Sequence, residues 1–249
     1  MRVWIAFAML LHAALAAASG LDDLRAALEK LRAKEPVHAR ISQENQGEFD
    51  DDGQKRTRQG RAVIVAEDGG PGHPLRLVYD DATLTQAARE QAGRRDSRGP
   101  GDAVRDLDAL KVLELLRPAE KLLEDLTGAQ LVSEKTEGAG AMGEPAATRV
   151  LELTLRAPRG IDQEKGFKVA RTAKIWIDSG GIPASSQVQT HTEVRRLIFK
   201  VRFDVTEKNT FAAAARRLVV RTRQTENRWK ASIFAEGSNR SSTTVEVVD

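Results

Sequence analysis

The first repeated apolar pattern in the body of the chain has the period of an α-helix. Between Gly20 and Lys34 the leucines recur at spacings of three, four and three residues, which places them on one stripe; they are Leu21, Leu24, Leu28 and Leu31. Two aspartates begin this segment and Lys34 ends it, as the helix dipole favours. Pro36 stops the helix. We therefore predict an amphipathic helix over residues 20–34.

After Pro36 the apolar period changes to two, which is the period of a β-strand. Val37, Ala39 and Ile41 alternate with polar residues, and residues 59–66 and 75–79 predict two further strands. The same period returns after Ala129, most clearly over residues 151–155, 174–178, 197–205, 218–225 and 242–248. Because short turns join neighbouring strands, we expect an antiparallel meander.

A helical insertion interrupts the meander over residues 82–128. Its second part, from Val104 to Leu126, is rich in leucine at helical spacing. Pro118 divides that part into two helices or kinks it, because proline cannot continue a helix, and Gly128 ends it.

These elements together predict the fold class, α+β. One face of each strand is apolar and the other is polar, so a large antiparallel sheet must hide its apolar face. The predicted helices are the available covers. We therefore expect a curved antiparallel sheet, an incomplete β-barrel, with the N-terminal helix and the insertion covering its concave face.

The first 18 residues have the form of an export signal. A positive start, an apolar run over residues 3–15 and the small residues Ala16–Ala18 predict cleavage before Ser19. The apolar run is short for a membrane span, and no later segment approaches one. We therefore expect one domain over residues 19–249, in the periplasm or otherwise outside the cytoplasm. The chain has no cysteine, and a lipid anchor at position 19 would require one.

Two segments carry a resemblance to a known family. The helix that begins Leu21-Asp22-Asp23-Leu24 leads directly into the strand Val37–Ser42, and a later strand pair turns at Trp176–Pro183. This arrangement resembles the LolA/LolB-like superfamily of periplasmic lipoprotein carriers, which are incomplete β-barrels. The resemblance implies an apolar hollow between the sheet and a helical lid, and a lid contact for which Arg40 is the candidate.

The sequence lacks a recognisable catalytic or metal-binding pattern. His38, His73 and His191 are far apart in the sequence, and no nucleophile-elbow sequence accompanies the serines. Residues 48–55 predict a turn or loop, and within it the run Asp50-Asp51-Asp52-Gly53 predicts an Asp-Gly hairpin, because its spacing does not match a calcium loop. The glycine-rich residues 138–143 predict a loop, since they do not lead from a strand into a helix. We therefore expect neither enzymatic activity, nor a metal, nor a cofactor.

The expected role is to bind an apolar ligand, such as a lipid or a lipoprotein acyl chain, as a carrier or a sensor. An acyl chain needs only aliphatic walls, so no special residue type is required. The candidate walls are the apolar residues of the insertion and of two strands: Leu107, Leu110, Leu113, Leu122, Leu123, Leu153, Val201 and Phe203.

An alternative interpretation is an interaction module that docks envelope proteins or an anionic membrane surface. The net charge is only +3, but residues 160–249 carry 16 lysines and arginines against 10 aspartates and glutamates. A basic sheet face could attract an anionic partner. The residues that would form it are Lys200, Arg202, Arg221, Arg223 and Arg228. Nucleic acid is not an expected partner of an exported protein.

Overall fold

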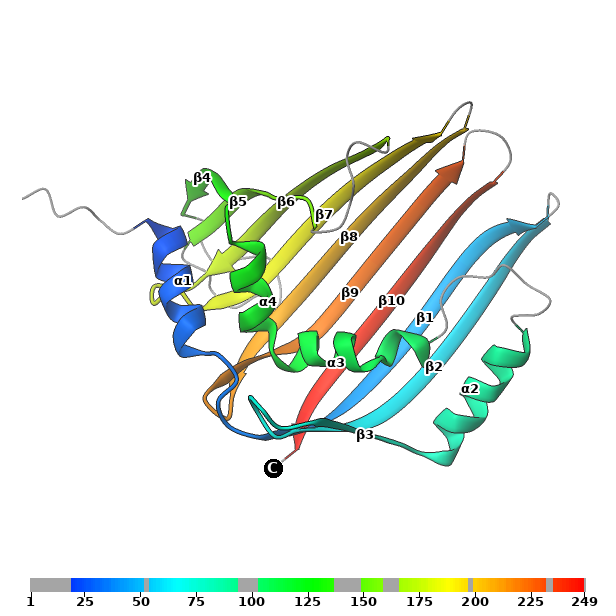
Figure 1. The fold of residues 1–249 in the computed structure, drawn as a ribbon, viewed down its shortest axis with the longest axis horizontal. Coiled ribbons are helices and arrows are strands. Elements are labelled where there is room, and N and C mark those ends of the chain that lie inside the picture. Colours follow the sequence, from blue (N-terminus) through cyan, green and yellow to red (C-terminus); the bar gives the residue numbers. More distant parts are fainter. Residues whose placement is uncertain are drawn as a thin grey trace, which may run out of the picture.

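A single antiparallel sheet of ten strands forms the framework of the protein (Figure 1). This is a computed structural model, and it describes residues 19–51, 54–93, 103–136, 149–158, 166–196, 199–231 and 235–248. The predicted signal peptide (residues 1–18) and the glycine-rich loop (residues 138–143) therefore lie outside the described residues. The strand order is β3-β2-β1-β10-β9-β8-β7-β6-β5-β4. The sheet is open, because β3 and β4 are its two edges.

The strands follow the predicted alternation but most are longer than predicted. Their bounds are β1 Val37–Asp51, β2 Gln54–Asp68, β3 Leu75–Tyr79, β4 Gln130–Lys135, β5 Arg149–Leu155, β6 Phe167–Ile177, β7 Pro183–Arg196, β8 Phe199–Ala214, β9 Arg217–Ala231 and β10 Ala235–Val248. All but one of the sheet pairings join strands that are neighbours in sequence, as a meander requires. The exception is the pairing of β1 with β10, which joins the first strand of the chain to the last.

The helices lie where the sequence predicts them, with shorter bounds. They are α1 Gly20–Lys30, α2 Asp81–Gly93, the 3-10 turn η1 Arg105–Leu107, α3 Ala109–Leu116 and α4 Pro118–Asp125. Pro118 stands at the first position of α4, where its missing N–H costs nothing. It therefore separates α3 from α4, as predicted. Figure 1 shows α1, α3 and α4 across one face of the sheet and α2 beside β2.

Strand alternation divides the side chains of the sheet between two faces. On β1, Ala39, Ile41, Gln43 and Asn45 are buried, and the residues between them are partly or fully exposed. Asn45 donates a hydrogen bond to Asp106 of η1 (2.8 Å), so the buried set lies on the side that carries the helices. We call this side the helix face and the opposite side the helix-free face.

The core beneath the helices consists of two clusters of buried apolar side chains. One joins α1 and α4 to β5 and β6 and includes Leu24, Leu122 and Leu153. The other joins η1 and α3 to β1 and β2 and includes Ile41 and Leu107. Both clusters are built from the residues whose periodicity predicted these elements. Hydrophobic burial therefore fixes the helices on this face of the sheet.

A buried ionic cluster connects the α3–α4 junction to the sheet. Asp68, at the end of β2, is 1% exposed, and Arg217, at the start of β9, is 0% exposed. Both Arg117 and Arg217 donate hydrogen bonds to the Asp68 carboxylate. Arg217 also donates to the carbonyl oxygens of Glu35 (2.8 Å) and Leu116 (2.9 Å). The cluster thus ties the last residue of α3 to three segments that are distant in sequence.

Acid should remove part of the stability through Asp68. Burial raises the pKa of this carboxyl, but hydrogen bonds from Arg117 and Arg217 outweigh burial and lower the pKa from 3.8 to about 2. A carboxyl with a depressed pKa stabilises the fold above its unfolded value and loses this contribution as pH falls. The shift corresponds to about 2 kcal/mol.

Urea unfolding of the wild type and of Asp68→Asn at about pH 5 and about pH 2 measures this contribution. We expect the difference in unfolding free energy between the two proteins to shrink by about 1–2 kcal/mol at the lower pH. A difference that stays constant with pH would contradict the assignment to Asp68.

Candidate functional site

The predicted wall residues of the insertion do not share one hollow. Leu107 is buried in the η1–α3 cluster, whereas Leu122 and Leu153 are buried in the α1–α4 cluster. Leu113 is half-buried, and Leu123 packs at the margin of the α1–α4 cluster. Leu110 is 76% exposed, contrary to the expectation that it faces the sheet. The first turn of α3 presents Leu110 to solvent because Val112, Leu115 and Leu116 supply its buried side.

The two predicted wall residues of β8 lie together, but on a part of the sheet away from the helical core clusters. Phe203 is 37% exposed and faces Trp229 across the β8–β9 ladder, and Val201 is the next residue on the same side. A Cβ on Gly237 of β10 would lie 2.7–2.8 Å from atoms of the Trp229 indole. The indole therefore lies over β10 at this glycine. Sequence reasoning did not include Trp229, because the pairing of β8 with β9 brings it to Phe203.

A cavity of about 120 Å³ lies between α3–α4 and strands β6–β9 on the helix face. Its apolar lining includes Leu122 of α4, Val188 of β7, and Val205 and Phe211 of β8. Charged side chains at the same cavity are paired with one another. Arg171 lies 3.0 Å from Asp125, Lys121 lies 2.7 Å from Asp125, and Arg223 lies 3.5 Å from Glu114.

The cavity and the aromatic pair belong to one continuous track. Val205 lines the cavity, and Phe203 is the next residue of β8 on the same face. Trp229 and Val201 extend the apolar surface from Phe203. We call the apolar surface from Leu122 through Val205 to Trp229 the helix-face track.

Arg40 lies on the face of the sheet opposite α3 and α4, contrary to the prediction from the family resemblance, and its charge acts on Asp80, the residue before α2. Arg40 is exposed on β1, between Ala39 and Ile41, whose side chains are buried on the helix face. Strand alternation therefore directs Arg40 to the helix-free face. Among the arginines that connect the helices to the sheet, Arg117 and Arg217 are the two that meet at the buried carboxylate of Asp68. Their role depends on three segments meeting in space, and no local sequence signal indicates it.

The predicted basic face is divided between two sides of the sheet. Arg223 lies on the helix face, where its Nε donates to Asn209 (2.9 Å). Lys200, Arg202 and Arg228 lie on the helix-free face by strand alternation, and Arg221 is exposed beside the bulge of the β8–β9 ladder. Carboxylates accompany two of the cations: Lys200 lies 2.9 Å from Glu193, and Arg228 lies 2.6 Å from Glu226. These residues therefore do not form one uniformly basic surface.

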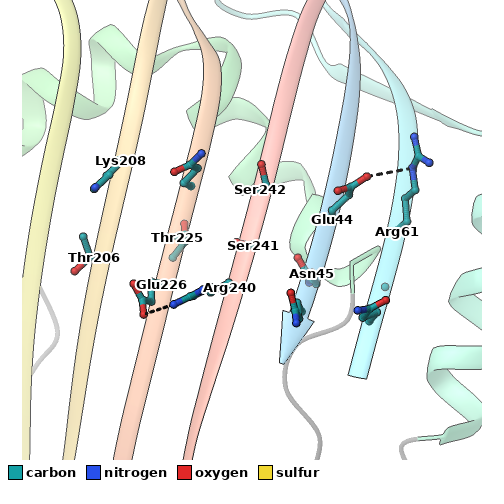
Figure 2. A pocket seen from close by; sticks show the side chains of 14 residues that line it. Glu44, Asn45, Arg61, Thr206, Lys208, Thr225, Glu226, Arg240, Ser241 and Ser242 are labelled. Carbon is teal, nitrogen blue, oxygen red and sulfur yellow. Dashed lines mark hydrogen bonds and ion pairs between the residues drawn. The ribbon is translucent and has the colours of Figure 1, made fainter. Parts of the chain in front are cut away.

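A second hollow, of about 790 Å³, lies on the helix-free face across five strands (Figure 2). Ten of its lining side chains form two rows, each with one residue from β2, β1, β10, β9 and β8 in register. The first row is Arg61, Glu44, Ser242, Gln224 and Lys208, and the second is Gln59, Gln46, Arg240, Glu226 and Thr206. We call this hollow the polar groove. Sequence reasoning missed it, because alternation identifies the outward residues but does not give their register across strands.

The polar groove continues into a neighbouring hollow of about 520 Å³, with which it shares Glu226 and Arg240. The two hollows together are lined by seven cations and six carboxylates. The cations are Lys55, Arg61, Arg202, Lys208, Arg228, Lys230 and Arg240, and the carboxylates are Glu44, Glu48, Asp50, Asp204, Glu226 and Glu236. The near balance of positive and negative side chains differs from the basic face that the count of charged residues over 160–249 suggested.

The described residues contain no group of three histidine, cysteine, aspartate or glutamate side chains placed to hold a metal ion. His191 is paired with Asp204 (2.5 Å) on the exposed surface of β7 and β8. The hairpin predicted at residues 50–53 is confirmed by the pairing of Asp51 with Gln54, although residues 52–53 themselves lie outside the description. Among the helices that the structure describes, none has the length and apolar character needed to cross a membrane.

Comparison of the chain with protein-family models, with curated proteins and with solved structures yields no match.

Proposed function

We propose that the protein binds an apolar ligand, a lipid or an acyl chain, on the helix face, as an extracytoplasmic carrier or sensor. The observation that carries this proposal is the helix-face track, in which a partly apolar cavity leads to the pair of exposed Phe203 and half-buried Trp229. The resemblance to the lipoprotein carriers and the predicted export signal support the same role.

The size of the cavity determines how such a ligand lies. About 120 Å³ accommodates about four water-sized groups, since a water occupies about 30 Å³ in the liquid. The end of an acyl chain therefore enters beneath α4, and the rest lies along Val205, Phe203 and Trp229. Each CH2 removed from water contributes about 0.8 kcal/mol. The paired charges at the cavity are positioned to meet a polar headgroup or solvent.

The alternative role in docking an anionic surface has less support. The cations on the helix-free face are interleaved with nearly as many carboxylates. Long-range attraction of an anionic membrane requires an excess of positive charge on one surface.

The proposal is tested with the purified protein and the apolar fluorescent probe N-phenyl-1-naphthylamine, together with mass spectrometry of extracted lipid. We expect the probe to brighten and lipid to be found. Phe203→Lys removes the exposed aromatic ring from the middle of the track, so we expect at least about tenfold weaker probe binding.

Val65→Lys is the matched control for this variant. Val65 is 41% exposed, similar to Phe203, but it pairs with Arg40 on β1 and lies on the helix-free face. We expect this variant to bind the probe as the wild type does. Absence of both lipid and probe fluorescence would refute the proposed function, and equal binding by Phe203→Lys would refute the track as the site.

A further inference from the structure

The polar groove has properties that the proposed function does not use. It lies on the face opposite the helix-face track, and none of the ten side chains in its two rows is apolar. Where the groove crosses it, β2 is paired only with β1, because its ladder with β3 begins at Ile64, but the other four strands, β8, β9, β10 and β1, have hydrogen-bonded neighbours on both sides there. Their backbone groups are therefore already paired, and a ligand in the groove must be recognised by side chains.

The side chains offer both hydrogen-bond donors and acceptors along the whole groove. Three amides come from Gln46, Gln59 and Gln224, and hydroxyls come from Thr206 and Ser242. Amides and hydroxyls can each donate and accept. Each row crosses five strands and is about 19 Å long, since neighbouring strands lie about 4.8 Å apart. The groove therefore suits an extended ligand that itself carries many donors and acceptors.

The charges of the groove are largely neutralised within the protein. Glu44 lies 3.6 Å from Arg61, and Glu226 lies 3.4 Å from Arg240. Figure 2 marks both pairs with dashed lines. A ligand with a high net charge would have to separate these pairs. A lipid tail would leave the polar side chains desolvated without partners, which is costly. A protein partner is also disfavoured, because the buried centres of such interfaces are rich in aromatic residues and poor in charge.

We infer that the polar groove binds a neutral oligosaccharide. Hydroxyl groups both donate and accept, so they match the amides, hydroxyls and ion-paired carboxylates and guanidiniums of the two rows. Ser242 stands at the middle of the first row, on β10, the central strand of the five, and it has the shortest side chain of that row. The site is independent of the helix-face track, because the sheet separates the two.

The test is isothermal titration calorimetry of the full protein with three neutral probes: cellohexaose, maltohexaose and chitohexaose. We expect at least one to bind. Ser242→Trp places a bulky side chain at the middle of the first row, at an exposed position, and should weaken binding at least tenfold. Gln46→Ala removes one amide without adding bulk and should weaken it severalfold, which keeps the test valid if the larger substitution disturbs folding.

Thr154→Trp is the matched control, because Thr154 is exposed on β5, outside the groove, and the substitution adds the same bulk. We expect its affinity to equal that of the wild type, and we expect added salt to change binding less than twofold. The inference is overturned if none of the three probes binds, if Gln46→Ala and Ser242→Trp bind like the wild type, or if binding falls steeply with salt, which would indicate an anionic ligand.

Discussion

Replacing Asp68 by asparagine should lower the free energy of unfolding by about 3–5 kcal/mol. The substitution keeps the size of the side chain but removes the charge that neutralises Arg217, which is 0% exposed. Removing one partner of a buried ion pair leaves the other charge uncompensated, and losses of about 3–5 kcal/mol are typical. Because Arg117 also donates to Asp68, the substitution weakens the connection between the α3–α4 junction and β2.

Glu67→Gln is the matched control for this prediction. Glu67 is the preceding residue of β2 and lies 3.3 Å from Arg76, but this pair is accessible to solvent, with side-chain exposures of 36% and 72%. Exposed ion pairs contribute about 0–1 kcal/mol. Urea denaturation of the three proteins at neutral pH measures the difference. Similar losses for Asp68→Asn and Glu67→Gln would show that the buried cluster does not stabilise the junction.

Alanine substitutions of two leucines that the sequence placed in the same hollow should have very different effects on the stability of the fold. Leu107 is 0% exposed within the η1–α3 core cluster, and Leu107→Ala should cost about 2–5 kcal/mol through lost burial and a residual cavity. Leu110 is 76% exposed, so Leu110→Ala should change stability by about 0.5 kcal/mol or less.

Equilibrium unfolding in urea distinguishes the two variants, and probe fluorescence adds a second measurement. Both residues lie outside the helix-face track, so probe affinity should remain that of the wild type wherever the variants are folded. A large loss of stability in Leu110→Ala would mean that this leucine is buried in solution. In that case the described position of the first turn of α3 would be wrong.

Much of the framework could be predicted because hydrophobic periodicity is a local property. The change from helical period to period two at Pro36 marks the junction of α1 and β1, and Pro118 marks the start of α4. The strands were predicted too short because their distal halves alternate less clearly. On β10, for example, serine and threonine replace the apolar residues before Val245.

The candidate site depended on information that periodicity does not contain. Alternation identifies Phe203 and Trp229 as members of strand faces, but only the pairing of β8 with β9 brings them opposite each other. The family resemblance suggested Arg40 as the lid contact, whereas Arg117 and Arg217 are the arginines that meet at the buried carboxylate of Asp68. The charge count over residues 160–249 suggested a basic face, because a count cannot distinguish the two sides of a sheet.

The sequence by itself determined the class of elements, their order and the meander, since burial of apolar side chains at a fixed period is specified locally. Tertiary structure alone decided which side of the sheet the helices cover, which arginines become buried around Asp68, and which outward residues align into the rows of the polar groove. Each of these depends on the pairing of segments distant in sequence. The pairing of β1 with β10, which lies about 200 residues later in the chain, is the clearest example.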